Sequence, residues 1–496
     1  MTELSARVVV IGTGSGGAVV AAMLAQAGVD VLMLEEGRHV PSSQFTQRDA
    51  DMYDKLFRDR GLQSTADGSI SVLQGSCVGG STVINQADVT PIPEELFAHW
   101  SSHYELSGIS YRDFRRAAET VERRIGAGPI ADHEINANNR RLVEAAQRRG
   151  LRAGFFRDNR VGCVGSGYCH LGCSYDAKQS ALITWIPDAL RAGARLLPQH
   201  RVERVIVRDG RVSGVIATRL DAARQPVETV SIRCDHVFVC AGAIHTPLVL
   251  QQSGVGGKHV GQHLSLQPQG AVMARFSDKV RSFRGIPQSG YVDEWETVDE
   301  AHGFGGFRIE GIFGPPATAT GFLPGFGKSV RPLLERYDHL GASLILVPDQ
   351  PSGAVSPTAA GRPDIAYRLS PDVFRRLHDG MREAARLYFD AGAEEVWFST
   401  LLSRSITHPD QIDDLLVRTP WRAISLRMIS AHPQGTARMS DHPGQGVVDS
   451  TFAVRGVRNL YVADASVFPT TSSSHTMLPV MAFARIAAER WLARFA

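Results

Sequence analysis

The 496-residue sequence has few cysteines, almost no net charge and no long hydrophobic run. Its 53 Lys and Arg residues nearly balance 51 Asp and Glu residues, so neither nucleic acid nor an anionic membrane surface is indicated as a main partner. No segment reaches about 18 consecutive apolar residues, and we therefore expect no membrane span. The N-terminus lacks a charged leader followed by a long apolar run, so we do not expect a secretory signal.

Six cysteines are too few for a disulfide framework in a chain of this length. We therefore expect a protein of the reducing cytoplasm. Glycine and proline are abundant instead, with 48 and 25 residues, and they indicate many tight turns. The length allows two or three domains and a large core.

Residues 6–37 have the pattern of a dinucleotide-binding unit. Gly12, Gly14 and Gly17 form G-x-G-x-x-G at the start of a helix rich in alanine and valine. The first glycine allows the tight turn, the second lets the backbone approach a pyrophosphate, and the third lets the helix pack on the strand. The free N–H groups and the positive dipole end of the helix then face the phosphates.

Two short apolar runs, 8–11 and 31–34, flank this turn and predict buried parallel strands. Glu35 follows the second run and is placed to accept hydrogen bonds from a ribose. Its charge would repel a 2′-phosphate, which disfavours a phosphorylated nicotinamide cofactor. The pattern does not separate FAD from NAD.

Two histidines near the C-terminus are the candidate catalytic residues. His432 lies in SAHPQGTARM and His475 in FPTTSSSHTMLP. Between them an apolar run ends at Asp464. A strand that ends on an acid, followed by a turn and a histidine ahead of a helix, builds a site at the carboxyl edge of a sheet. We expect both imidazoles to converge on one face of a bound flavin.

Three cysteines, Cys163, Cys169 and Cys173, cluster among glycines in the loop 161–175. Thiolates at such spacing can bind a metal or an iron–sulfur centre. The loop lacks the paired C-x-x-C of structural zinc sites. The alternatives are three reduced cysteines that pack within the loop, or one disulfide between two of them.

The remaining segments predict the rest of the architecture. Residues 111–126 and 136–151 have helical periodicity and predict surface helices, while 195–218 predicts a β-meander with a turn at Asp209–Gly210. Residues 262–425 contain aromatic, glycine-rich strands and one strong helix at 370–392. Their apolar residues either line a substrate pocket or pack the sheet core: Phe304, Phe307, Ile309, Ile312, Phe313, Phe322 and Phe326.

Several motifs resemble those of the glucose–methanol–choline (GMC) flavoprotein oxidoreductases. The loop 73–91 contains Gly79, Gly80, Ser81 and Asn85, which are similar to the Gly-Gly-Ser…Asn element of that family. HPQGTARM resembles the H-x-x-G-T-x-x-M element, and residues 447–470 resemble the VVD…NLYV.D.S..P segment. The resemblance implies FAD as cofactor. Some members attach FAD through a histidine where this chain has Ile84, so we predict non-covalent FAD.

The resemblance also assigns roles to single residues. Val202 takes the position whose backbone contacts adenine, and Ala241–Gly242 belongs to an element near the adenosine. Asp464 matches the position beside the ribityl chain, and Thr476 stands at the start of the last helix. That helix would stabilise negative charge on the reduced flavin.

The implied chemistry is oxidation of an alcohol. One of His432 and His475 takes the hydroxyl proton, the other fixes the oxygen, and the α-hydrogen leaves as hydride to the flavin. We favour His432 as base. Electrons then pass to oxygen, a quinone or a redox protein, and the sequence does not decide which.

Three functions stay open. The cysteine loop resembles long-chain alcohol oxidases through Cys173, Ala177–Ser180 and Thr184–Trp185. It also resembles sugar dehydrogenases in which three cysteines hold an iron–sulfur cluster. A non-catalytic flavin-binding interaction protein is the third.

We predict an α/β protein (α+β overall). It has a Rossmann-like FAD-binding domain at 1–261, with a helical insertion at about 92–160, and a substrate domain of mainly antiparallel sheet plus helices at 262–425. Residues 426–496 return to the first domain.

Overall fold

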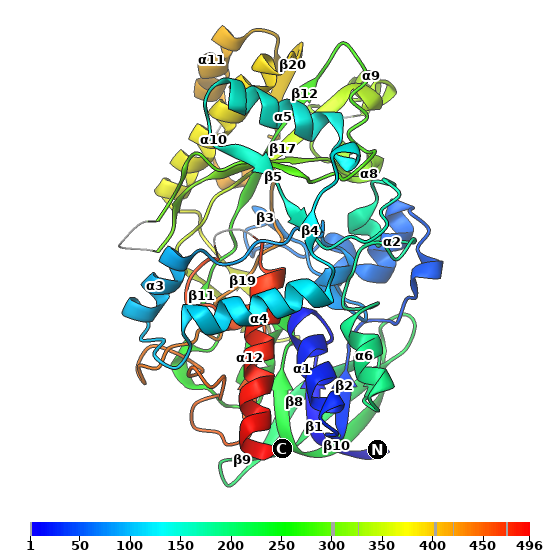
Figure 1. The fold of residues 1–496 in the computed structure, drawn as a ribbon, viewed down its shortest axis with the longest axis vertical. Coiled ribbons are helices and arrows are strands. Elements are labelled where there is room, and N and C mark those ends of the chain that lie inside the picture. The colour runs from blue at the N-terminus through cyan, green and yellow to red at the C-terminus, as the bar shows by residue number, and fades with distance from the viewer. Residues whose placement is uncertain (1, 299–302, 326, 401–403, 420, 473–474) are drawn as a thin grey trace.

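The computed structural model describes residues 2–298, 303–325, 327–400, 404–419, 421–472 and 475–496 (Figure 1). The molecule is elongated, with one sheet near the two chain termini and a second sheet at the opposite end (Figure 1). Its mixed α/β composition confirms the predicted fold class. None of the described helices is long and apolar enough to cross a membrane.

The first sheet contains the predicted N-terminal strands. β1 (Thr2–Ile11) pairs in parallel with β2 (Val31–Leu34) and with β10 (Pro226–Val239), which also pairs with β23 (Leu460–Val462). Strands with both faces covered need apolar residues in succession, and the valines of β1 at positions 8, 9 and 10 are fully buried. The helices α1 (Ser15–Gln26) and α12 (Met477–Phe495) pack together against this sheet (Figure 1).

An antiparallel meander extends this sheet. β8 (His200–Arg208) and β9 (Arg211–Leu220) pair across a two-residue turn, and β9 pairs with β10. Both turn residues have positive φ, 50° at Asp209 and 68° at Gly210, as this tight hairpin requires. The edge strand β7 (Arg195–Leu197) pairs instead in parallel with β2.

The second sheet is antiparallel, as expected from residues 262–425. Its order is β21 (Ser405–Ile406), β20 (Glu395–Phe398), β12 (Gln269–Arg275), β17 (Leu340–Leu346), β16 (Arg308–Ile312), β13 (Gly290–Val292) and β5 (Ala153–Phe155). The predicted helix is α10 (Pro371–Asp390), which packs on β12 and β17. The sheet therefore has one face covered by α10.

One predicted surface helix is placed differently from the expectation. α4 (Tyr111–Arg124) packs on α12 near the first sheet, but α5 (Ala137–Arg148) packs on β13 and β16 of the second sheet. Asn139 is fully buried there, and its side-chain oxygen accepts hydrogen bonds from the amides of Ser289 and Gly290. Asn139, in a segment predicted to be a surface helix, thus hydrogen-bonds to backbone amides at the start of β13. The helix α5 and the strand β5 pack with the second sheet, whereas the sequence assigns residues 92–160 to the FAD-binding domain.

Two short strands extend the second sheet. β22 (Met428–Ser430) pairs in parallel with β3 (Ile70–Val72) and contacts β12 through Ile429. The segments that follow β3 and β22 are the glycine-rich loop 73–91 and the stretch with His432. The fold thus brings both predicted functional segments to the junction of the two sheets.

Candidate active site

A cavity of about 220 Å³ lies at this junction. One side is formed by Ser15 at the start of α1 and by residues of the loop 73–91. The opposite side is formed by alternate residues of the second sheet, on the face away from α10. The apolar strand residues include Met273, Ile312, Ala342 and Leu344, and Phe313 and Phe322 from the segments after β16 and α8 (Pro316–Thr320) add to the apolar lining.

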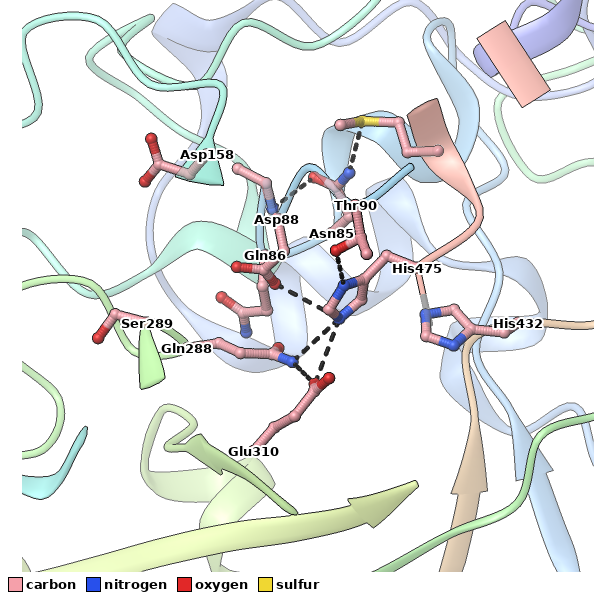
Figure 2. Close-up of polar contacts among 12 residues, drawn as sticks. Asn85, Gln86, Asp88, Thr90, Asp158, Gln288, Ser289, Glu310, His432 and His475 are labelled. Carbon is pink, nitrogen blue, oxygen red and sulfur yellow. Dashed lines mark hydrogen bonds and ion pairs between the residues drawn. The ribbon is translucent and has the colours of Figure 1, made fainter. Parts of the chain in front are cut away.

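His432 and His475 both line the cavity. Their ring centroids are 5.4 Å apart and the rings are nearly perpendicular, at 88° (Figure 2). His432 follows β22, and His475 precedes α12. The two imidazoles, which the sequence expects to converge, are therefore neighbours on one cavity.

The environment of His432 favours the neutral imidazole. Nδ1–H donates to Oε1 of Gln267 at 2.5 Å, which leaves Nε2 without a hydrogen-bond partner among the described residues. Burial and, to a smaller extent, the nearby charge of His475 lower the pKa of His432 to about 3, against a smaller opposing effect of Glu310. A neutral ring with a free Nε2 lone pair can accept a proton.

The surroundings of His475 favour the charged imidazole instead. Its Nε2 lies 3.3 Å from Oε2 of Glu310 and 3.7 Å from Oδ2 of Asp88, and its Nδ1 lies 3.3 Å from Oγ1 of Thr90 (Figure 2). Burial alone would lower the pKa of His475, but the two carboxylates outweigh it and raise the pKa above its ordinary value. The carboxylates therefore favour the charged imidazolium, although Nε2 of Gln288 also lies 3.3 Å from Nε2 of His475.

Glu310 is itself fixed by Arg308 of its own strand β16 and by Gln288, which precedes β13. It is fully buried, Gln288 donates a hydrogen bond to its Oε2, and Arg308 Nη1 lies 3.8 Å from its Oε1. Burial raises the pKa of Glu310, but His475 and Arg308 outweigh that effect and the pKa falls below its ordinary value. Glu310 is thus the anion that balances His475.

The predicted glycines make a close contact between two loops. A Cβ at Gly12 would lie 2.3 Å from the carbonyl oxygen of Cys240, and one at Gly17 would lie 1.9 Å from the Gly12 oxygen. A Cβ at Gly80, whose φ is +53°, would lie 2.8 Å from Cα of Gly14. Backbone of the first glycine turn therefore lies directly against the second glycine loop, and neither tolerates a side chain.

Thr13, which sequence reasoning missed, joins these loops to Glu35. Its hydroxyl donates to Oε2 of Glu35 at 2.7 Å and accepts a hydrogen bond from the amide of Gly79 at 3.1 Å. The other Glu35 oxygen accepts from the amide of Gly37. Burial raises the pKa of Glu35, against smaller effects of these donors.

Asp464 is likewise held by protein donors. Its Oδ2 accepts from the amide of Gly242 at 2.9 Å and from the hydroxyl of Thr246, and its Oδ1 accepts from the amide of Ser466. It ties the start of α7 (Gly242–Gln252), just after Ala241, to the end of β23. Its contact with a ribityl chain stays a prediction.

The remaining predicted cofactor residues lie at element ends. Asn85 donates to Sδ of Met477 at 3.0 Å, which joins the loop 73–91 to α12, and Thr476 is the N-cap of that helix. Ser81 and Ile84 line the cavity. Val202 stands at a β-bulge, where the β8–β9 register shifts; a bulge leaves backbone groups unpaired.

Two of the three loop cysteines accept hydrogen bonds from protein groups. Cys163 accepts from the amide of Gly165 and Cys169 from Arg160, at 3.4 Å each. All six cysteines are free thiols. Within the described ranges, no group of three or more His, Cys, Asp or Glu side chains is placed to bind a metal. The structure gives the iron–sulfur alternative no support.

The apolar residues predicted for the pocket divide into two sets. Ile312, Phe313 and Phe322 line the cavity, whereas Phe304, Phe307 and Ile309 are buried in the core clusters. Phe326 lies outside the described residues.

Sequence reasoning missed the polar residues that set the charges of the histidines. Asp88 and Thr90 come from the loop 73–91, whereas Gln267, Gln288 and Glu310 come from three other segments of the chain. One signal was present: Glu310 is an isolated acid in a strand whose neighbours Ile309 and Ile312 are apolar. A buried acid in such a run points to a functional site.

Comparisons with known proteins show the family of this chain. Family profiles described as GMC oxidoreductase match residues 53–269 and 351–484. An uncharacterized GMC-type oxidoreductase of Mycobacterium tuberculosis is 32% identical over 99% of this chain and 76% of that protein. A long-chain-alcohol oxidase of Arabidopsis thaliana is 26% identical over 97% of this chain and 68% of that protein.

A solved structure shares the fold. The crystal structure of pyridoxine 4-oxidase from Mesorbium loti superimposes with a TM-score of 0.74, covering 99% of this chain and all of the other. At 17% identity this likeness shows the fold alone.

The contact between Gly14 and Gly80 yields a prediction. We expect Gly80→Ala to decrease the flavin content of the purified protein strongly, because the new Cβ would push the two glycine loops apart. Gly28→Ala is the matched control, since Gly28 also has positive φ but no atom lies within 4 Å of its Cβ position. The ratio of flavin to protein absorbance measures the effect. Equal flavin content in both variants would contradict the close-contact argument.

Proposed function

This chain belongs to the GMC oxidoreductase family, and on that basis we propose that it oxidises an apolar alcohol to an aldehyde or ketone with non-covalent FAD. GMC oxidoreductases bind FAD. The observation that carries the proposal is the pair of neighbouring imidazoles whose pKa values are shifted in opposite directions. Such pairs divide the acid and base roles between them.

Two glycine loops and the N-terminus of α1 form a site that fits FAD. Two glycine backbones approach so closely that no Cβ fits, and the start of α1 has no side-chain cap, so its amides are free for a phosphate. When bound, FAD supplies the acceptor for the hydride. We propose that the residues holding it are Gly12, Gly14, Gly17, Glu35, Gly79, Gly80, Ser81, Asn85, Val202, Ala241, Gly242, Asp464 and Thr476.

His432 has the properties of the base. Its Nδ1–H is fixed by Gln267, so Nε2 presents its lone pair to the cavity and takes the hydroxyl proton of the alcohol. Because its pKa is about 3, the ring is neutral and available across the neutral range. Its conjugate acid readily gives the proton up again.

His475 stabilises the developing negative charge. As an imidazolium beside the cavity it lowers the free energy of an alkoxide oxygen, and the N-terminus of α12 adds a positive dipole at the same place. Only the hydroxyl group of the alcohol then has to lie between the two imidazole rings. The carbon chain is free to extend over the apolar sheet.

The apolar lining supports a hydrophobic substrate. The sheet face over the cavity offers alkyl and aromatic side chains, and the small residues Ala271 and Ala342 leave space between them. This composition favours a long or aromatic apolar chain over a free sugar. The electron acceptor, whether oxygen, a quinone or a redox protein, is left open, and six unpaired thiols support a reducing, cytoplasmic setting.

Replacing either histidine tests the catalytic assignment. We expect His432→Ala and His475→Ala each to slow flavin reduction by alcohol by about 10²–10⁴-fold without loss of flavin. The rate is measured by rapid mixing without oxygen. His133→Ala, at an exposed histidine, is the control. Near wild-type rates in both active-site variants would overturn the assignment.

Chain length tests the substrate class. Each buried methylene contributes about 0.8 kcal/mol, so we expect kcat/KM to rise about fourfold per methylene of a primary alcohol until the cavity is full. Ala342→Phe narrows the cavity and should reduce activity on long alcohols more than on short ones. Val417→Phe, at a residue 83% exposed, should leave the series unchanged. A flat series in the wild-type protein would argue against an apolar substrate.

A further inference from the structure

Asp88 is a buried carboxylate beside the histidine pair that the chemistry above does not use. It lines the cavity and is only 3% exposed. Its Oδ2 lies 3.7 Å from Nε2 of His475, and its Oδ1 has no hydrogen-bond partner among the described residues. A buried carboxylate oxygen without a donor is unfavourable and calls for an explanation.

Several charged groups lie near Asp88. They are His475, Glu310, Arg160 and Asp158, and of these His475 lines the cavity. Arg160 is occupied by an ion pair with Asp158 and by a hydrogen bond to the Gln86 carbonyl oxygen. Burial, helped by Glu310 and Asp158 and opposed by His475 and Arg160, raises the pKa of Asp88 to about 7. Asp88 therefore changes charge within the neutral pH range.

The histidine pair needs such a group. When His432 takes the proton of the alcohol, its ring becomes positive beside the positive ring of His475, with the centroids 5.4 Å apart. Two like charges at this distance in a buried cavity repel strongly. The repulsion disappears if His475 then gives up a proton.

We propose that Asp88 accepts the Nε2 proton of His475 once His432 has accepted the hydroxyl proton of the alcohol, so that His475 is still charged while the alkoxide forms. This inference rests on the alcohol oxidation proposed above. The N–H bond at Nε2 breaks, its electron pair stays on nitrogen, and an O–H bond forms at Oδ2 of Asp88. His475 and Asp88 both become neutral, His432 becomes positive, and the pocket has gained one proton, which came from the alcohol.

Glu310 is less suited to this role than Asp88. Gln288 donates to Glu310, and Arg308 lies near its other oxygen, so both neighbours favour the ionised form. Among the described residues, Oδ1 of Asp88 and Oε1 of Glu310 both lack a hydrogen-bond partner, but the raised pKa of Asp88 makes its carboxylate the stronger proton acceptor of the two. Asp88 thus acts through His475, while Glu310 fixes the ring in place.

The pH dependence has a definite sign. Asp88 can accept a proton only as the carboxylate, so the rate of flavin reduction by alcohol should increase as pH rises through about 7. At higher pH the rate should fall again when His475 loses its proton, above the ordinary pKa of histidine.

The test replaces Asp88 by Asn, which keeps the shape and removes the titrating group. We expect Asp88→Asn to bind flavin, to reduce it about tenfold or more slowly at saturating alcohol and pH 8, to change KM little, and to lose the rise near pH 7. Asp88→Glu should restore the rise. Asp158→Asn, at the neighbouring buried carboxylate, should retain it.

Each outcome decides the matter. A pH profile of Asp88→Asn with the wild-type shape, at whatever rate, would overturn the proposal, and so would loss of the rise in Asp158→Asn. If Asp88→Asn binds no flavin, the proposal stands only if Asp88→Glu reduces flavin with a rise displaced toward another pH. A wild-type protein that no alcohol reduces would sink the proposed function itself, which is a separate result.

Discussion

The buried ion pair between Glu310 and His475 is the interaction on which the site depends. Nε2 of His475 lies 3.3 Å from Oε2 of Glu310, and Glu310 is fully buried. Away from water each charge needs the other, because an unpaired buried ion is strongly unfavourable. The pair therefore fixes both the orientation and the charge of His475. His432 lies beside that charge, bonds to neutral Gln267, and is driven to the neutral form.

This polarised pair exists only because the two sheets meet at the cavity. Glu310 is on β16 of the second sheet, while His475 is at the start of α12, which packs on α1 of the first sheet. His432 follows β22, which pairs with β3 and contacts β12. Asn85 ties the loop 73–91 to Met477, and buried Lys178 donates to the backbone oxygens of Val83, Asn85 and Cys169. Displacing any of these segments would separate the charges.

The sequence predicts the parts of this arrangement that local patterns encode. The glycine turn, β1, β2 and the hairpin at Asp209–Gly210 each follow from a few neighbouring residues. Long-range polar contacts are different. Neither the link of Thr13 to Glu35 and Gly79 nor the burial of Asn139 has a signal in its own segment, because the partner comes from a distant part of the chain. Both histidines could be identified from their local motifs. Their opposite charge states could not, because the residues that set these charges come from distant parts of the chain.

Direct observation of the protons on His432 and His475 tests the central claim. Neutron diffraction at neutral pH, or nitrogen-resolved NMR of the histidine rings with His432→Asn and His475→Asn for assignment, distinguishes the two states. The account predicts one proton on His432, at Nδ1, and two protons on His475. Identical protonation of the two rings, or a neutral His475 beside a charged His432, would contradict it.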